Sequence, residues 1–426
     1  MRSLLDRDDA ALAGVSKLRF FPLAVTGGSG GWLLEEGGRR VLDLSAGWTA
    51  AGLGYGHPRI VEAVTSALRD QSGASGLSAV NQHMVGLAED LRRITPIAAA
   101  EPDRRVYLGN SGTDANEAAL RSCRLATGRR RILAFHGGYH GGLGVAMGVS
   151  GLYVDAGMPG DADSRLLHFP RRPDEVSSVL ADLARELDAA DVACFIVEPI
   201  QSDGGIVIPP AGFLSQAVGL CRAAGVPVII DEVKVGLGRT GLLHAFEHEG
   251  ITPDLVTFGK VIGGGLPLSA AVGPKSILDV AAATSLLTTS GNPVCAAAGR
   301  AVLATLERDE LPQRAAVAGA RMLEALNADR AAGQGDTRGR GLTIGVDVLD
   351  PLTGEPSPHL ARKVVYRAHQ LGVVVYYVGG HVLEVTPVLS IPDDEIDFGV
   401  DVLHTAFTDA VRGIVSDDEV APYAGW

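Results

Sequence analysis

The sequence predicts an α/β fold with a large, mainly parallel sheet and a second, smaller α+β domain. Short apolar runs alternate with longer helical patterns from about residue 58 to residue 300, as buried parallel strands and their crossover helices do. Beyond residue 300 the pattern changes to helices mixed with short strands. A chain of 426 residues is long enough for both parts, and it shows no fixed-period repeat.

Six apolar runs are expected to be strands of the large domain, and the Ala-rich or amphipathic stretches between them are expected to be helices. The strands are expected at residues 105–108, 131–135, 193–198, 226–231, 255–258 and 270–272, with helices at 116–127, 173–187 and 213–224. Ligands of such sheets bind at the carboxyl ends of the strands, so chemistry is expected there.

The rest of the chain is expected to form the smaller domain. A helix at about residues 293–306 closes the large domain, and strands are expected at 342–348, 373–378 and 382–386. The N-terminal segment has a hairpin pattern at residues 32–44 and is expected to join them. The predicted limits are therefore 1–57 for the N-terminal segment, 58–305 for the large domain and 306–426 for the small domain.

Composition argues against several kinds of partner. The formal net charge is −13, from 37 basic and 50 acidic residues, whereas nucleic-acid binders normally carry a basic face. No stretch approaches the roughly 18–20 uninterrupted apolar residues of a membrane helix. Acids near the N-terminus do not fit a signal peptide. We therefore expect a cytoplasmic protein with neither a nucleic-acid nor a membrane partner.

No metal site is expected. The four cysteines are scattered, and three of them lie in apolar or Ala-rich surroundings, which is typical of reduced core thiols. His136 and His140 lie in a Gly-rich loop, while His244 and His248 lack a third ligand or an HExxH pattern.

A turn of small residues, Ser111-Gly112-Thr113, lies between an expected strand and an Ala-rich helix. Free backbone N–H groups at such a helix start, beside serine and threonine hydroxyls, form a phosphate site. A simple helix N-cap is the alternative.

Two further strand ends carry charged side chains. Asp231 ends an apolar run, where an acid must find a cationic partner or become neutral; a helix cap or a surface turn is the alternative. Lys260 ends the next run, where lysine is rare unless it is paired or reactive; a snorkelling surface lysine is the alternative. A phosphate cradle, a carboxylate for a protonated ring nitrogen and a lysine for an imine are what pyridoxal phosphate (PLP) requires.

Together these motifs resemble the class III aminotransferase family of fold type I PLP enzymes. The matching stretches are Ser111-Gly-Thr-Asp-Ala-Asn-Glu-Ala, Asp231-Glu-Val-x-x-Gly-x-Gly-Arg-Thr-Gly, Phe258-Gly-Lys260 and Gly291-Asn-Pro, in order over nearly the whole chain. The resemblance implies that Lys260 forms the internal aldimine and that Asp231 pairs with the pyridine nitrogen. It further implies phosphate contacts from Ser111, Gly112 and Thr113, ring contacts from Tyr139 and Val233, and a homodimer with shared sites in which Thr288 reaches the neighbouring subunit's phosphate.

Three positions depart from a typical aminotransferase. Glu384 stands where relatives that bind a carboxylate place an arginine, so a carboxylate substrate would meet a like charge; an inert exposed acid is the alternative. Lys234 stands where many relatives have Gln, near the cofactor's phenolic oxygen, and its positive charge is expected to stabilise that oxygen as a phenolate; a salt bridge to Glu232 or another acid is the alternative. Asp203 stands where Gly-Glu-Gly-Gly is common and offers a second acid/base opposite the lysine; a cap for the following glycine turn is the alternative.

These departures resemble one subgroup, the α-amino-ε-caprolactam racemases, which also act on amino acid amides. The shared stretches are Lys17-Leu-Arg-Phe-Phe-Pro-Leu-Ala, Ile200-Gln-Ser-Asp-Gly-Gly, Asp231-Glu-Val-Lys-Val-Gly-Leu, Val375-Tyr-Tyr-Val-Gly and Ala424-Gly-Trp. The resemblance implies that Lys260 and Asp203 exchange the α-proton through the external aldimine. It also implies a substrate pocket lined by Trp48, Phe20, Tyr377 and Glu384, for substrates without a free carboxylate.

Two other functions remain as alternatives. An aminotransferase of an ω-amine, amino acid or amino sugar can also do without a carboxylate clamp. A non-catalytic PLP-binding regulator would need a basic DNA-binding head, for which the chain has neither the length nor the charge.

Overall fold

The computed structural model describes residues 2–423 and 425, which form two compact units. The large unit is Pro58–Pro312, and the small unit joins the described parts of Met1–His57 and Gln313–Trp426. The expected limit after residue 305 lies inside helix α10 (Pro293–Arg308), whereas the structure divides after Pro312. Ala424 and Trp426 of the C-terminal stretch lie outside the described residues. None of the described helices is long and apolar enough to cross a membrane.

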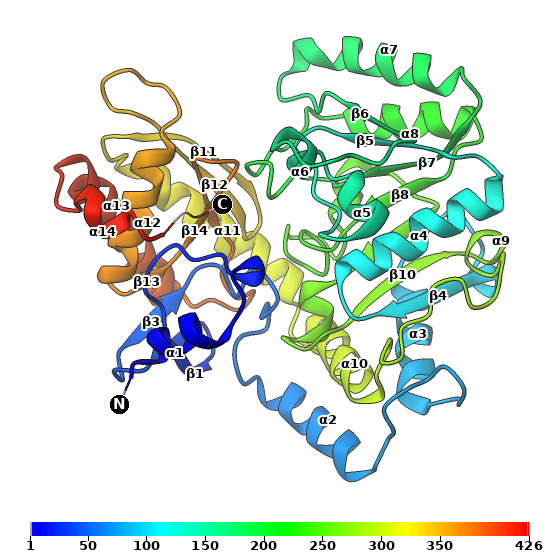
Figure 1. Ribbon diagram of the computed structural model, residues 1–426, viewed down its shortest axis with the longest axis horizontal. Coiled ribbons are helices and arrows are strands. Elements are labelled where there is room, and N and C mark those ends of the chain that lie inside the picture. Colours follow the sequence, from blue (N-terminus) through cyan, green and yellow to red (C-terminus); the bar gives the residue numbers. More distant parts are fainter. Residues whose placement is uncertain (1, 424, 426) are drawn as a thin grey trace. The chain divides into compact units, whose positions relative to one another are not determined.

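The large unit is built on a sheet of seven described strands (Figure 1), in the order β4-β10-β9-β8-β7-β5-β6. Strand β10 is antiparallel to both of its neighbours, and the other pairs are parallel, which confirms the mainly parallel sheet. The strands are β4 (Arg104–Gly109), β5 (Arg131–Phe135), β6 (Ser164–Leu167), β7 (Val192–Val197), β8 (Val228–Asp231), β9 (Leu255–Phe258) and β10 (Ser269–Pro274).

Helices lie between these strands along the chain, and others precede β4 and follow β10. The α-helices are α2 (Pro58–Arg69), α3 (Gln82–Ile94), α4 (Gly112–Thr127), α5 (Gly144–Gly148), α6 (Gly151–Asp155), α7 (Val176–Leu187), α8 (Phe213–Ala223), α9 (Lys275–Leu278) and α10. Short 3-10 helices are η2 (Glu101–Asp103), η3 (Pro173–Glu175), η4 (Ala245–Glu249) and η5 (Lys260–Gly263).

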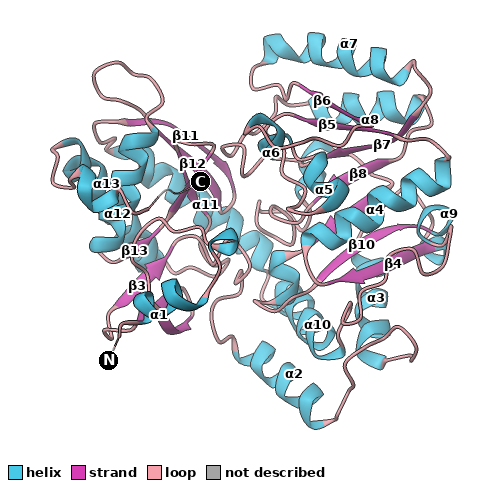
Figure 2. Cartoon of the chain, viewed as in Figure 1, coloured by secondary structure: helices cyan, strands magenta, loops and turns pink. Residues whose placement is uncertain are grey.

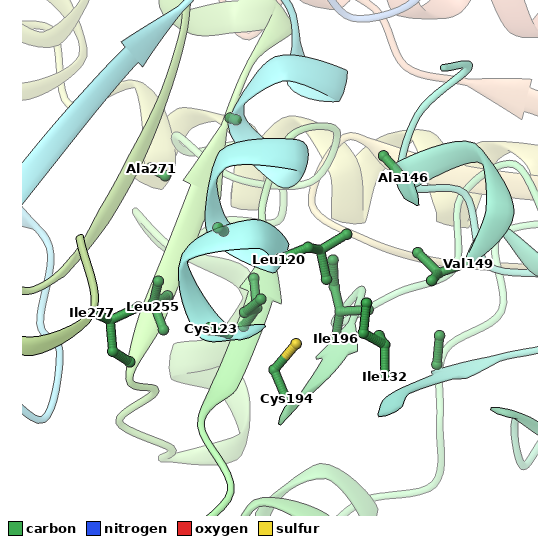
Figure 3. Packing of buried hydrophobic residues seen from close by; sticks show 14 residues of the cluster. Leu120, Cys123, Ile132, Ala146, Val149, Cys194, Ile196, Leu255, Ala271 and Ile277 are labelled. Atoms are coloured by element: carbon green, nitrogen blue, oxygen red, sulfur yellow. The ribbon is translucent and has the colours of Figure 1, made fainter. Parts of the chain in front are cut away.

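Helix α4 lies against β4, β10, β9 and β7 of this sheet, and its ends follow from the sequence. Ser111 is the N-cap and forms a capping box with Asp114, so the helix begins at Gly112, before the expected residue 116. Gly128 ends it with φ 67°, a conformation that glycine adopts without steric cost. Figure 3 shows the packing beneath it, where Leu120 and Cys123 lie among Ile132, Cys194, Ile196 and Leu255. This packing fixes the first turn of α4 at the carboxyl end of β4.

The small unit holds two four-stranded sheets in its described residues, with the orders β1-β2-β3-β13 and β11-β12-β15-β14 (Figure 2). The predicted single strand at 373–378 is wrong: it breaks at Val375, because β13 pairs with β3 while β14 pairs with β15. The strands are β1 (Val25–Ser29), β2 (Trp32–Glu35), β3 (Arg40–Asp43), β11 (Gln334–Arg340), β12 (Thr343–Val348), β13 (Val373–Val374), β14 (Tyr376–Val378) and β15 (Val382–Val385). The helices of this part of the chain are α1 (Leu4–Ala11), η1 (Gly14–Ser16), α11 (Leu311–Ala328), α12 (Pro358–Gln370), α13 (Asp393–Val411) and α14 (Asp417–Val420).

A left-handed turn follows β3. Ala46, Gly47, Trp48 and Thr49 all have positive φ, between 47° and 67°. The Thr49 amide donates to the Ser45 carbonyl at 2.8 Å, so the backbone closes on itself. Left-handed helical conformation costs L-residues roughly 1–2 kcal/mol each, and such a turn persists only where its surroundings hold it.

Gly319 of α11 provides a test of this packing. A Cβ on Gly319 would collide with the backbone carbonyl of Gly341, whereas Gly219 of α8 has no such neighbour within 4 Å. Gly319→Ala is therefore expected to lower the free energy of unfolding by about 1–3 kcal/mol. Gly219→Ala, the control, is expected to leave it unchanged or raise it, because alanine favours helices. Equal thermal unfolding midpoints for the two variants would contradict the close approach.

Candidate active site

The first turn of α4 presents backbone N–H groups at the carboxyl end of β4. Gly112 and Thr113 follow the N-cap, where helical amides have no partner within the helix. The Ser111 hydroxyl accepts from the Asp114 amide at 3.4 Å, and the Thr113 hydroxyl accepts from the Gly142 amide at 3.2 Å. Ser111 thus does cap the helix, as the alternative supposed. The same turn still has the amides and the helix dipole that favour an anion.

Asp231 ends β8 and is only 3% exposed, so the surface-turn alternative is wrong. Its Oδ2 accepts from Asn116 Nδ2 at 2.8 Å and lies 2.8 Å from His140 Nδ1. Its Oδ1 accepts from the Val233 amide at 3.0 Å. These three contacts fix the carboxylate in place at the end of an apolar strand.

Sequence reasoning missed Asn116 and His140 as partners of this acid. Asn116 is buried on an Ala-rich helix and also donates to the His140 carbonyl at 2.7 Å. His140 was considered only as half of a histidine pair. A signal for Asn116 did exist, because a buried amide in an otherwise small and apolar helix must find a hydrogen-bond partner.

Asp203 and Lys234 form a buried ion pair, with Asp203 Oδ1 2.8 Å from Lys234 Nζ and side-chain exposures of 10% and 5%. Burial alone would raise the pKa of Asp203. The charges of Lys234 and Lys260 lower this pKa by more than burial raises it, so it lies below its usual value. Lys234 thus pairs with another acid, as the alternative supposed, and that acid is Asp203. Two of the three departures from an aminotransferase are therefore one interaction.

Glu232 has a separate role. Its carboxylate oxygens accept from the amides of Ala245 and Phe246, each at 2.9 Å. Burial raises the pKa of Glu232 to about 8 despite these bonds. The side chain therefore anchors the η4 segment.

Lys260 opens η5 directly after β9 and has φ 48°, in the left-handed region. The residue is half-buried, and its positive charge lowers the pKa of the buried Asp203. An isolated lysine on the outer surface does not fit these observations.

Glu198 ties two loops of the site together and was not singled out from the sequence. Its Oε1 accepts from the Tyr139 amide at 2.9 Å, and its Oε2 accepts from the Ser202 amide at 3.3 Å. Burial, followed by the nearby charge of Asp231, raises the pKa of Glu198 well above its usual value. The available signal was its place just beyond β7, an apolar strand, which matches the place of Asp231 on β8.

Tyr139 and Val233 are both bonded to acids of this network through their backbone amides, Tyr139 to Glu198 and Val233 to Asp231. Burial raises the pKa of the Tyr139 phenol above its usual value. Val233 packs against the glycines of two turns: a Cβ on Gly112 would be 2.6 Å from Val233 Cγ1, and one on Gly259 would be 3.0 Å from the same atom. Val233 therefore joins the α4 turn to the residue before Lys260.

The four expected pocket residues lie in the small unit. Phe20 and Tyr377 are buried, with ring centroids 5.1 Å apart, and Trp48 stacks on Tyr376 at 4.7 Å. Glu384 is on β15 opposite Tyr376 and is 1% exposed, so the exposed-acid alternative is wrong. Tyr376 was missed because the paired tyrosines of 375–379 gave no reason to prefer one ring.

Two further expectations concern residues away from this network. Thr288 is exposed in the loop between α9 and α10. Among the described residues, no three His, Cys, Asp or Glu side chains are grouped so as to hold a metal ion.

Comparisons with known proteins show the family of this chain. The class III aminotransferase family matches residues 14–407. The chain belongs to this family. It is 32% identical to isoleucine 2-epimerase of Lentilactobacillus buchneri, over 99% of this chain and 98% of that one. It is 34% identical to 4-aminobutyrate aminotransferase of Mycobacterium leprae, over 90% of each chain. A PLP-bound amine transaminase from an uncultivated Pseudomonas species is 27% identical, with a TM-score of 0.84 over 94% of this chain and 97% of that one.

As a class III enzyme, the protein has the PLP fold type I and uses pyridoxal 5'-phosphate. The residues present fit this cofactor. Asp231 is a buried carboxylate fixed by three contacts, which suits a protonated ring nitrogen. The start of α4, with its free amides, follows β4 and suits the phosphate, and Lys260 follows β9, the neighbour of the strand that carries Asp231, and suits the aldehyde.

Replacing Asn116 tests the role of its contact with Asp231. Asn116→Ala removes one hydrogen bond to a charged group, which is worth about 1.5–3 kcal/mol, so the Kd for PLP is expected to rise about tenfold or more. Titration of the apoprotein, followed by cofactor absorbance, measures this Kd. Asn327→Ala, in α11 of the small unit, is the control and is expected to leave it unchanged. An unchanged Kd in Asn116→Ala would remove Asn116 from the site.

Proposed function

We propose that this class III enzyme racemises small α-amino compounds without a free carboxylate, namely amino acid amides and α-amino lactams such as α-amino-ε-caprolactam. Lys260 and Asp203 are the two bases. The observation that carries the proposal is the buried Asp203–Lys234 ion pair, whose carboxylate also senses the charge of Lys260. The likeness to an isoleucine 2-epimerase supports chemistry at an α-carbon in this family.

In this proposal Lys260 would hold the aldehyde end of the cofactor, and Asp231 would hold its ring nitrogen. The α4 turn, Ser111-Gly112-Thr113, holds the phosphate, and Tyr139 and Val233 contact the ring. Thr288 of the partner subunit reaches the same phosphate in a homodimer. When bound, the cofactor supplies an electron-withdrawing ring that stabilises negative charge on the substrate's Cα.

The protein's own groups move the proton. One of Lys260 Nζ and the Asp203 carboxylate accepts the proton from the substrate's Cα, and the other donates a proton to the opposite side, which inverts the configuration. Asp203 must be ionised in order to accept. The Lys234 charge keeps it ionised in a buried place where a lone carboxyl group would be neutral.

Glu384 supports substrates without a carboxylate. Its burial on β15 leaves little water around it, so a substrate carboxylate at this position would meet another acid where a carboxylate-binding relative offers a guanidinium. An amide or lactam N–H, in contrast, can donate a hydrogen bond to it. We propose that Glu384 takes the place of the arginine of carboxylate-binding relatives.

A single incubation separates this proposal from the aminotransferase alternative, which the likeness to a 4-aminobutyrate aminotransferase favours. One enantiomer of α-amino-ε-caprolactam is incubated with the PLP-loaded enzyme and no keto acid, and products are resolved by chiral chromatography. A racemic product with cofactor absorbance unchanged is expected. Retained chirality with stoichiometric conversion of the cofactor to its pyridoxamine form would overturn the racemase proposal and favour transamination.

The Lys234 charge predicts a shift in the pH profile. The pKa of Asp203 is held below its usual value by Lys234 and Lys260, so the wild-type rate is expected to fall only at low pH. In Lys234→Gln, only Lys260 remains to oppose the effect of burial on Asp203, so the pKa of Asp203 rises. The acid limb of kcat against pH is therefore expected to move upward by about one unit or more.

Lys234→Arg is the matched control for that profile. It keeps the positive charge, and its acid limb is expected to stay close to that of the wild type. Identical acid limbs in Lys234→Gln and the wild type would exclude Asp203 as a titrating base.

A further inference from the structure

Asp43, at the end of β3, is the centre of the hydrogen bonds around the left-handed turn. It is 1% exposed. Its Oδ1 accepts from the Ser45 amide at 2.8 Å, and its Oδ2 accepts from the Gly47 amide at 2.9 Å and from the Tyr55 hydroxyl at 2.6 Å. The Asp43 carboxylate therefore gathers donors from both the turn and the segment that follows it.

The turn carries the Trp48 backbone in the same network. The Trp48 amide donates to the Ser45 hydroxyl at 3.0 Å, directly after the residues that Asp43 holds. Successive backbone N–H groups in such conformations converge on an anion, and here the anion is a side chain of the protein itself. Trp48, with φ 58°, is thus held by Ser45, and Asp43 in turn holds the amides of Ser45 and Gly47.

The Trp48 ring belongs to a row of stacked rings within the small unit. Trp48 stacks on Tyr376 with an interplanar angle of 12°, Tyr376 on Phe21 at 9°, and Phe21 on His369 at 8°. The successive centroid distances are 4.7, 5.8 and 4.6 Å. His369 is in turn held by Glu35, 2.8 Å from its Nε2. His369 is thus held by the half-buried Glu35, and Trp48 follows directly after a turn whose amides are held by the buried Asp43.

We propose that Asp43 and Tyr55 are positioning residues that set the plane of the Trp48 ring, and thereby the preference for substrates with a bulky apolar ring or side chain. The inference rests on the proposed function and on the place in the substrate pocket that the resemblance to α-amino-ε-caprolactam racemases implies for Trp48. A flat indole face offers a large apolar contact area that a saturated lactam ring can cover and a small side chain cannot. A strained turn held by so many bonds fixes such a face before substrate arrives.

Kinetics with a large and a small substrate test this role. Asp43→Asn loses one of its acceptor oxygens, and KM for α-amino-ε-caprolactam is expected to rise about tenfold while kcat changes less than about threefold. KM for alaninamide is expected to stay nearly constant. Tyr55→Phe, which removes one hydrogen bond, is expected to give the same pattern with a rise of about threefold.

Asp350→Asn is the matched control, because Asp350 also accepts from two backbone amides, those of Leu352 and Thr353, in an exposed turn of the same unit. It is expected to leave both KM values unchanged. Equal rises for both substrates, or the same change in Asp43→Asn as in Asp350→Asn, would overturn the proposal.

A spectroscopic measurement keeps the test independent of activity. In protein labelled with 5-fluorotryptophan, the three tryptophans give separate ¹⁹F signals, and the Trp48 signal is assigned by its loss in Trp48→Phe. Asp43→Asn and Tyr55→Phe are expected to move that signal and leave the Trp32 signal in place. An unmoved Trp48 signal would overturn the positioning role. A moved signal in an enzyme that racemises neither substrate would instead overturn the proposed function.

Discussion

The burial of three carboxylates at adjoining strand ends is the constraint around which the active site is built. Glu198, Asp203 and Asp231 lie at or just beyond the carboxyl ends of β7 and β8, and all three are buried. An unpaired buried charge costs several kcal/mol, so each acid must be satisfied by a partner or become neutral. The loops after β7 and β8 supply some of those partners, namely Ser202, Val233 and Lys234, and separate segments supply the others: Asn116 on α4, and Tyr139 and His140 after β5. The conformations of these segments therefore depend on the buried acids that they contact.

Each acid meets this constraint in a different way. Asp231 is held by an amide side chain, a histidine and a backbone N–H; Asp203 is paired with Lys234; Glu198 accepts two backbone bonds but has its pKa raised by burial. Environments that push the pKa values of neighbouring carboxyl groups apart give them separate roles in acid–base chemistry. In the proposed racemase, Asp231 serves the cofactor, Asp203 exchanges a proton with the substrate, and Glu198 positions the loops that carry Tyr139 and Ser202.

The large unit was the more predictable part of the fold. Six of its seven described strands lie at the apolar runs that predicted them, and the motifs at the ends of two of these marked Asp231 and Lys260. Strand β6 (Ser164–Leu167) was missed, because only two of its four residues are apolar. The partners of Asp231 could not be found in this way, because Asn116 and His140 approach it from separate segments. The same limit applies to the Lys234–Asp203 pair, in which each residue was noted for its own departure from the family pattern and the ion pair appears only on folding.

Two features of the backbone could not be predicted from the sequence either. The residues Ala46-Gly47-Trp48-Thr49 do not predict a left-handed turn, because only one of the four is glycine. The turn depends on the Asp43 side chain, which accepts from the amides of Ser45 and Gly47. Residues 373–378 look like one strand because alternation does not reveal that successive residues pair with different sheets. Both features depend on contacts between segments, which single-segment patterns do not contain.

The stereochemistry of hydrogen exchange in Asp203→Asn tests the two-base account most directly. Each enantiomer of α-amino-ε-caprolactam is incubated separately with this variant and PLP in D₂O, and deuterium at Cα and the enantiomer ratio are measured. With only Lys260 active, one enantiomer is expected to gain deuterium with retained configuration, and the other is expected to exchange hardly at all. Racemisation of both enantiomers at the wild-type rate would contradict the account, because a group other than Asp203 would then supply the second proton.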